Sequence, residues 1–239
     1  MNFTTRIDQR EIMDEEVIGR NQLRSAYQDI NRSNKMLGGY LSTYTALHKL
    51  WSRNPTDTIK LLDIGCGDGA MLRYLATRFR KKGVNVSCIG IDLNQRAIDL
   101  ARHNSEGFGE IEFLVADILN LNQSFPRHDY VLCTLTMHHF SDHEIPILLQ
   151  ECKKYCKKAI VINDLQRSKA AYYLFKFFSA IFIVSSVAKN DGLVSIRKGF
   201  VRDELETFAE PHEGWDHQIK WSWAFRYVWV MENNRPKEE

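Results

Sequence analysis

A glycine-rich loop is the strongest chemical signal in the sequence. The stretch Leu61–Ala70 reads LLDIGCGDGA and lies between a predicted strand and a predicted helix. Because Gly65, Gly67 and Gly69 have no side chains, the backbone can turn sharply and a ligand can lie close to the chain. Free N–H groups at the start of the following helix favour an anionic ligand group. The loop therefore predicts a nucleotide-like cofactor.

Carboxylates accompany this loop and the two predicted strands that follow it. Asp63 precedes the loop, Asp92 ends the strand IGID, and Asp117 follows the strand FLVA. A carboxylate at Asp92 can accept hydrogen bonds from both hydroxyls of a ribose. The loop and Asp92 suit a nicotinamide cofactor or S-adenosylmethionine (SAM) equally well. An acid at Asp117 would reach an adenine amino group, and the oxidoreductase pattern does not account for an acid at this position.

Three side chains at the ends of later strands are candidate proton acceptors. His138 and His139 follow the fourth predicted strand, and Asp164 follows the fifth. The carboxyl ends of parallel strands form the functional edge of such a sheet, and a histidine has a suitable intrinsic pKa for a general base. One histidine of the pair has an alternative role in packing or capping the next helix, and Asp164 is a rival base.

Short apolar strands alternate with amphipathic helices from residue 59 onward. This alternation predicts an α/β fold with a doubly wound, mostly parallel sheet covered by helices on both faces. The predicted strands are Ile59–Ile64, Val86–Ile91, Ile111–Val115, Tyr130–Thr134 and Ala159–Ile162, with helices around 70–82, 94–103 and 142–155. His217–Trp223 and Phe225–Met231 have no room for a helix between them and predict an antiparallel edge hairpin. Residues 21–52 predict two helices that break at Gly38-Gly39.

These motifs together resemble the class I SAM-dependent methyltransferases over residues 59–164 and the terminal hairpin. The resemblance implies seven strands in the order 3-2-1-4-5-7-6 with the last strand antiparallel. It also implies that Asp63 meets the cofactor amino group, Asp92 the ribose and Asp117 the adenine. The full set of implied cofactor-binding residues is Asp63, Gly65, Cys66, Gly67, Asp92, Leu93, Asp117, Ile118, Thr134 and Leu135.

Within that family the sequence is similar to the ubiquinone and menaquinone type of small-molecule methyltransferase. The stretch Leu135–Phe140 (LTMHHF) and the pair Asn163-Asp164 carry this similarity, and Glu11–Asp14 (EIMD) resembles small members of polyketide-type pathways. The resemblance implies O- or C-methylation of a small, fairly apolar acceptor that is phenolic, quinone or polyketide-like. The alternatives are an NAD(P)-dependent oxidoreductase and a non-catalytic SAM-binding partner subunit.

The segment between the fifth strand and the hairpin is unusually apolar. Residues 170–187 carry Lys176 as their one charge. A membrane span here would interrupt the sheet, so we expect a lid over the acceptor pocket. The alternatives are plain core packing and a peripheral membrane or homodimer contact. The Asn190-Asp191-Gly192 stretch predicts a turn. The predicted organisation is an N-terminal helical cap at 1–52 and a SAM-binding domain at 53–239 with a helical insertion at about 165–200.

Composition narrows the classes of partner and compartment. With 32 basic and 30 acidic residues, the net charge of +2 gives no electrostatic reason to expect a nucleic-acid partner. The five cysteines are odd in number and include no CxxC pair, so we expect no disulfide framework and no metal site. The N-terminal stretch is too polar for a signal peptide, which predicts a cytoplasmic protein.

Overall fold

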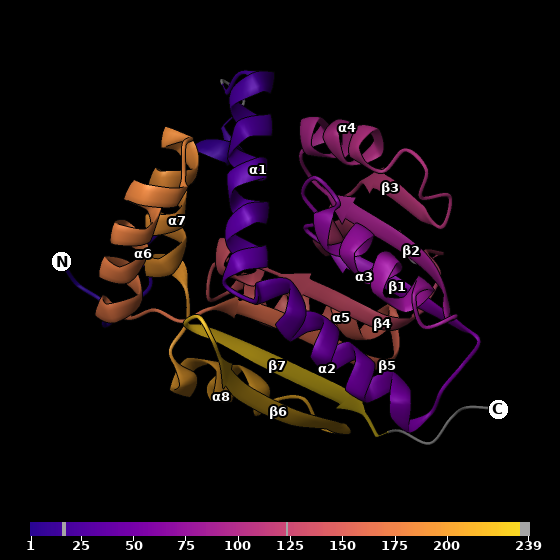
Figure 1. The fold of residues 1–239 in the computed structure, drawn as a ribbon. Coiled ribbons are helices and arrows are strands. Elements are labelled where there is room, and N and C mark those ends of the chain that lie inside the picture. The colour runs from indigo at the N-terminus through magenta and orange to yellow at the C-terminus, as the bar shows by residue number, and fades with distance from the viewer. Residues whose placement is uncertain (16–17, 123, 235–239) are drawn as a thin grey trace.

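The computed structural model describes residues 1–15, 18–122 and 124–234. Seven strands form one sheet in the order β3-β2-β1-β4-β5-β7-β6 (Figure 1). The strands are β1 (Thr58–Ile64), β2 (Asn85–Asp92), β3 (Ile111–Val115), β4 (His128–Thr134), β5 (Cys156–Leu165), β6 (Trp215–Ser222) and β7 (Arg226–Asn233). The first five pair in parallel, and β7 runs antiparallel to both β5 and β6. The predicted strand order, the edge hairpin and the fold class are confirmed.

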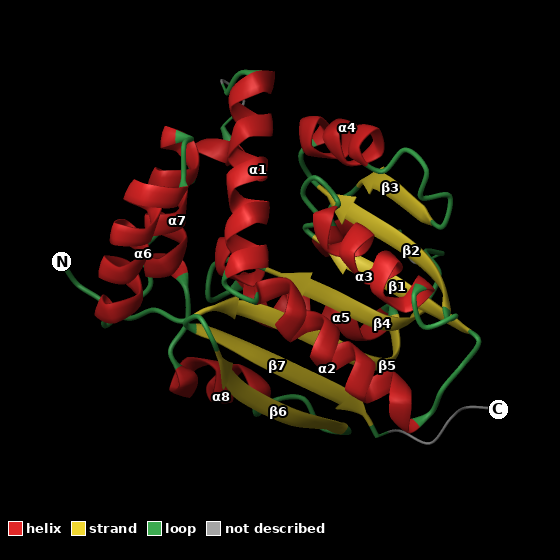
Figure 2. Cartoon of the chain, in the orientation of Figure 1, coloured by secondary structure: helices red, strands yellow, loops and turns green. Residues whose placement is uncertain are grey.

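Helices cover both faces of this sheet (Figure 2). The α-helices are α1 (Arg20–Met36), α2 (Gly39–Arg53), α3 (Ala70–Arg80), α4 (Gln95–Asn104), α5 (Glu144–Lys154), α6 (Lys169–Phe182), α7 (Ser186–Lys198) and α8 (Arg202–Ala209). Three short 3-10 helices are η1 (Ile12–Asp14), η2 (Ile118–Asn120) and η3 (Met137–His139). One apolar core joins α2, α3 and α4 to the sheet, and a second joins α5 and α8 to its other face. All five cysteines are free and buried.

The predicted turn at Asn190-Asp191-Gly192 is wrong, because these residues lie inside α7. Gly192 is needed for close helix packing: a Cβ there would lie 2.3 Å from the ring of Phe175 on α6. The Asp191 carboxylate accepts hydrogen bonds from the backbone N–H groups of Ile12 (3.0 Å) and Met13 (2.9 Å). Turn-forming residue types are used here for tertiary contacts, which local sequence signals do not distinguish from turns.

The apolar residues 170–187 are divided between two helices: they form most of α6 and the first residues of α7. α6 ends at Phe182, and Ser185 caps the start of α7 by accepting a hydrogen bond from the Ala188 N–H (3.3 Å). Both helices stand beside α1 in Figure 1. In the part of the chain that the structure describes, we find no helix with both the length and the apolar character that crossing a bilayer requires.

Candidate active site

A large cavity opens at the carboxyl edge of the central strands, and residues of α1 and α6 form part of its lining. Its volume is about 1070 Å³. All the predicted cofactor-binding residues line it, together with both candidate histidines: Asp63, Gly65, Cys66, Gly67, Asp92, Leu93, Asp117, Ile118, Thr134, Leu135, His138 and His139. Asp164 is buried behind His138 and outside the lining. The topology brings the predicted set together because the carboxyl ends of parallel strands meet at one edge.

The glycine loop lies directly under helix α1. Gly67 has a left-handed backbone (φ 54°), and a Cβ there would lie 2.8 Å from the ring of Tyr27 on α1. The Gly67 N–H donates a 2.9 Å hydrogen bond to Asp92 Oδ2. A side chain at this position would both strain the turn and push α1 away. The glycine therefore keeps the end of β1 open to a ligand and close to α1.

The Asp92 carboxylate joins the loops after β1 and β2. Besides Gly67, it accepts a 2.9 Å hydrogen bond from the Asn94 N–H through Oδ1. Burial raises the pKa of Asp92 despite these two donors. Each carboxylate oxygen has two lone-pair sites, so both oxygens can still accept from a diol in the cavity. This capacity fits the hydroxyl pair of a ribose.

Asp117 and Asp63 stand at opposite ends of the predicted cofactor region. The Asp117 carboxylate caps η2 by accepting from the Leu119 N–H (2.9 Å) and the Asn120 side-chain amide (2.7 Å), which presents Ile118 to the cavity. Asp63 is 2% exposed, and burial, aided by the Asp92 charge, raises its pKa to about 8. A cationic group placed beside Asp63 would favour its ionised form.

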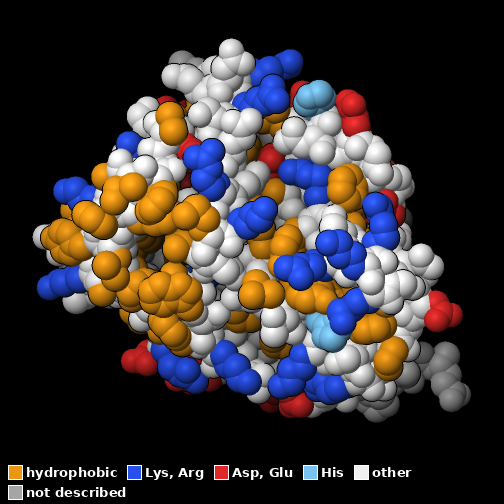
Figure 3. Space-filling view, in the orientation of Figure 1, with side chains coloured by type: hydrophobic (Ala, Val, Ile, Leu, Met, Phe, Trp, Pro, Cys, Tyr) orange, Lys and Arg blue, Asp and Glu red, His pale blue; other side chains and the backbone are white. Residues whose placement is uncertain are grey.

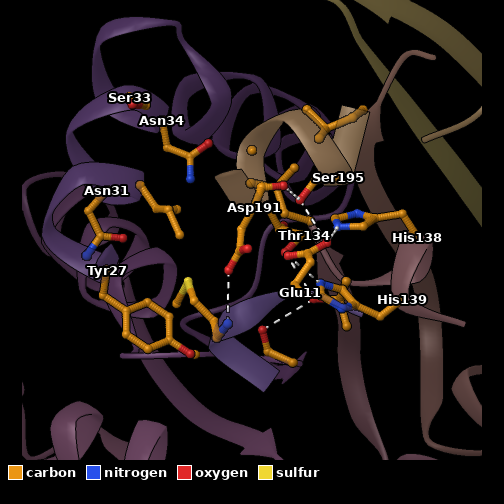
Figure 4. A pocket seen from close by; sticks show the side chains of 18 of the residues that line it. Glu11, Tyr27, Asn31, Ser33, Asn34, Thr134, His138, His139, Asp191 and Ser195 are labelled. Atoms are coloured by element: carbon orange, nitrogen blue, oxygen red, sulfur yellow. Dashed lines mark hydrogen bonds and ion pairs between the residues drawn. The ribbon is translucent and has the colours of Figure 1, made fainter. Parts of the chain in front are cut away.

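His138 forms a buried ion-pair network with the carboxylates of Asp164 and Glu11, and Figure 4 shows it beside Glu11. Its ring Nδ1 lies 2.7 Å from Asp164 Oδ1, and its backbone N–H donates a hydrogen bond to Asp164 Oδ2 (3.1 Å). Its ring Nε2 lies 3.4 Å from Glu11 Oε1. Burial lowers the pKa of His138, but Asp164 and Glu11 outweigh burial and raise it to about 9. The Asp164 pKa is lowered, because its pairing with His138 outweighs burial. At neutral pH His138 therefore holds its proton and positions neighbouring groups.

His139 is the more exposed member of the histidine pair. Its Nδ1 lies 3.2 Å from Asp14 Oδ2, and 31% of its side chain is exposed. Its Nε2 lies 3.8 Å from Glu11 Oε2, beyond hydrogen-bond distance. A carboxylate on one ring nitrogen fixes the tautomer and leaves the other nitrogen able to accept a proton. The geometry thus favours His139 over His138 as a proton acceptor.

The N-terminal residues reach this site, which the sequence alone did not indicate. The Glu11 carboxylate also accepts from Ser195 Oγ (2.9 Å) and lies 3.6 Å from Lys198 Nζ. Burial raises the pKa of Glu11, but His138, His139 and Lys198 outweigh it and lower the value to about 2. Arg6 extends the attachment by donating to the carbonyl oxygens of His138 and Phe140. The EIMD motif was visible in the sequence, but its role depends on contacts between residues far apart in the chain.

Glu11, His138 and His139 also have the residue types of a metal site. Their ligand atoms all lie within 4.8 Å of one another. However, the His138 imidazolium and Lys198 already supply positive charge to Glu11. A protonated imidazole cannot ligate a metal. We therefore assign these residues to the ion-pair network.

Comparisons with known proteins agree with this geometry. Residues 61–159 match the family model described as a methyltransferase domain. The ubiquinone biosynthesis O-methyltransferase of Rickettsia bellii is 30% identical over 57% of this chain and 54% of its own length. The 2-phytyl-1,4-naphtoquinone methyltransferase of Thermosynechococcus vestitus is 32% identical over 30% of this chain and 34% of its own. The chain thus spans about half, or less, of these curated relatives.

Solved structures share the fold over most of the chain. The plantazolicin methyltransferase BpumL, solved with a triazolic desmethylPZN analogue and SAH, has a TM-score of 0.68 at 18% identity, covering 90% of this chain and 96% of that one. The magnesium protoporphyrin IX methyltransferase of Synechocystis PCC 6803, solved with bound SAM, has a TM-score of 0.60 at 12% identity, covering 91% and 92%. The family match and the solved structures lead to one conclusion: residues 61–159 match a methyltransferase domain, and the strand order is the one that the resemblance to class I SAM-dependent methyltransferases implies.

Proposed function

We propose that this protein binds SAM and transfers its methyl group to a small, fairly apolar acceptor. The observation that carries the proposal is the single cavity that joins the glycine loop and Asp92 to an apolar region under α6. A volume of about 1070 Å³ lies just above the roughly 300–1,000 Å³ typical of one ligand site, which leaves room for a cofactor and an acceptor together. Residues 1–52 would form the cap of this site over the domain of residues 53–239.

In this proposal each predicted side chain has a defined role toward SAM. Asp63 would face the amino group, the region around Gly65, Cys66 and Gly67 the methionine end, and Asp92 with Leu93 the ribose. Asp117 and Ile118 would hold the adenine. Thr134 and Leu135 would line the methyl-donor side, and the buried Thr134 hydroxyl has no hydrogen-bond partner within the described chain.

When bound, SAM supplies an activated methyl group, so the protein mainly has to align the acceptor and exclude water. The cavity does this with an apolar wall: Leu174, Phe177 and Phe178 of α6 face it. His139 would accept the proton of an acceptor hydroxyl or acidic carbon. Asp14 would position its ring, and His138 with Asp164 would hold η3 in place.

The relatives' names favour phenolic and quinone-like acceptors. They include a ubiquinone biosynthesis O-methyltransferase and a 2-phytyl-1,4-naphtoquinone methyltransferase. We extend this class to the present chain because its cavity joins apolar α6 side chains to a histidine that can accept a proton. O- and C-methylation both fit this arrangement.

Binding calorimetry tests the cofactor assignment first. SAM and its demethylated product S-adenosylhomocysteine (SAH) should bind, and NADH should not. Tritium-labelled SAM is then incubated with a catechol and a hydroxynaphthoquinone, and the extracted organic phase is counted. Binding of NADH in preference to SAH would contradict the family role. SAH binding without transfer to either acceptor would support a non-catalytic subunit instead.

The first prediction concerns α6 as a cover for the acceptor. Phe177 is 70% exposed and also lines the cavity. Hydrophobic side chains gather at the left of Figure 3, over the region where Figure 1 labels α6. Phe177→Ser should raise the acceptor KM roughly 5- to 10-fold through lost apolar contact, with SAH affinity unchanged. The matched control is Ile181→Ser on the same helix, which is 60% exposed and outside the cavity lining. Equal effects of the two changes would refute the role of α6 as a lid.

A peripheral membrane or homodimer contact through residues 170–187 stays a prediction.

The second prediction concerns the pH dependence of cofactor binding. Asp63, whose pKa is raised to about 8, is mostly protonated at pH 6.5. A ligand ammonium selects the carboxylate, so SAH affinity should rise up to about tenfold per pH unit between pH 6 and 7.5. Asp63→Asn should flatten this slope in calorimetry across that range. An equally steep slope in the variant would assign the proton to another group.

A further inference from the structure

Arg226 is a buried cation that has no carboxylate partner among the residues that the structure describes. It is 4% exposed and lines the cavity. Within the described chain it forms no ion pair, and its guanidinium donates a hydrogen bond from Nη2 to Asn34 Oδ1 (2.7 Å). The Nε and Nη1 atoms are buried and have no hydrogen-bond partner in the described part of the chain. Burying a charge without a partner is costly, so this arrangement suits a group that is completed by a ligand.

The surroundings of Arg226 favour an anion beside its guanidinium. Its guanidinium lies against Gly39, the first residue of α2: a Cβ at Gly39 would lie 3.1 Å from Arg226 Cζ. The N-terminus of a helix carries partial positive charge, so the helix end and the guanidinium repel each other and both favour an anion. Asp164 acts on Arg226 only at a distance and is already paired with His138.

The position of Arg226 in the sheet points to the acceptor instead of the cofactor. β7 is separated from β1 by β4 and β5, which at about 4.8 Å per strand places its backbone about 14 Å from the glycine loop's strand. Its neighbours at the cavity wall are the aromatic residues Trp223 and Phe225. Burial lowers the pKa of Arg226 to about 10, so the group remains charged at neutral pH.

We propose that Arg226 binds a carboxylate carried by the acceptor, so that the substrate is an aromatic or apolar acid. This assignment rests on the proposed function. With one Nη2 hydrogen used by Asn34, the guanidinium keeps at least one edge with two parallel N–H donors, which matches the two oxygens of a carboxylate. Lysine cannot offer this geometry.

The test uses 2-naphthoate and its neutral counterpart 2-naphthylmethanol as probes, with calorimetry on the SAH-loaded and the free protein. The SAH-loaded wild type should bind the acid at least about tenfold more tightly. Arg226→Met should abolish this preference and Arg226→Lys should restore only part of it, while SAH affinity stays unchanged in both. Because the cation is unpaired in the free protein, Arg226→Met should also keep or raise the melting temperature.

Each other result would overturn the proposal. No preference in the wild type would remove the acid from the acceptor class. A drop in SAH affinity in Arg226→Met, with the naphthoate preference intact, would assign the guanidinium to the cofactor's own carboxylate. A melting temperature lowered in both variants, with the naphthoate preference retained in Arg226→Lys, would make the arginine structural. Failure of the wild type to bind SAH contradicts the proposed function separately, since the probe preference is also measured without SAH.

Discussion

Replacing His139 with alanine should lower kcat by about 10²–10⁴-fold, the usual contribution of a well-placed general base. The reason is geometric: His139 lines the cavity, is oriented by Asp14 through Nδ1, and keeps Nε2 outside hydrogen-bond distance of Glu11. Initial rates with tritium-labelled SAM at saturating acceptor measure the effect. The wild-type pH–rate profile should show an ascending limb that disappears in the variant. SAH affinity should change little.

His138→Gln is the matched control, because the two rings lie only 4.4 Å apart. His138 is buried and paired on both sides, so its loss should destabilise the protein by about 3–5 kcal/mol in denaturant unfolding. The sign follows from its pKa of about 9: this stabilisation is fully present below about pH 6.5 and is lost as pH rises through 9. An ascending limb near pH 9 that vanishes in His138→Gln would instead make His138 the base. Full activity of a folded His139→Ala protein would show that His139 is not a general base. Alignment of the acceptor with the methyl group would then account for catalysis.

The sheet and its functional edge could be predicted from the sequence because their signals are local. Strand and helix ends depend on short-range periodicity, and parallel strands bring their carboxyl ends together once their order is known. Asp63, Asp92, Asp117 and the histidine pair were placed in this way, each within two residues of a strand end or on the turn that follows it. In the structure these side chains line one cavity, and their roles toward a cofactor stay predictions.

The rest of the site depends on contacts that no local pattern encodes. Glu11 meets Ser195 across 184 positions of sequence, and Arg226 meets Asn34 across 192. Asp191 looked like part of a turn because its residue type is common in turns, whereas here it anchors the N-terminal backbone. The separate roles of His138 and His139 could likewise not be predicted from the sequence, because they depend on which of the two rings is enclosed by carboxylates.

Replacing Asp92 with alanine should weaken SAH binding roughly 10- to 150-fold in calorimetry, the loss expected when a charged acceptor for buried hydroxyls is removed. The matched control is Asp129→Ala. Asp129 also accepts a hydrogen bond from the backbone of a neighbouring strand, at the Lys60 N–H (2.9 Å), but it lies outside the cavity lining. Its loss should leave SAH affinity unchanged. Unchanged affinity in a folded Asp92→Ala protein would remove the ribose assignment.

Asp92 also holds the Gly67 N–H, so part of the loss in Asp92→Ala could come from a disordered glycine loop. A double-mutant cycle separates the two contributions by pairing Asp92→Asn with the 2′-deoxy analogue of SAH. If Asp92 contacts the ribose, the wild type should discriminate against the deoxy analogue and the variant should not. If the loop alone is affected, removal of the hydroxyl from the ligand should lower its affinity for both proteins by the same factor. The carboxylate would then support the cofactor site by holding the β1 loop against α1, without contact to the sugar.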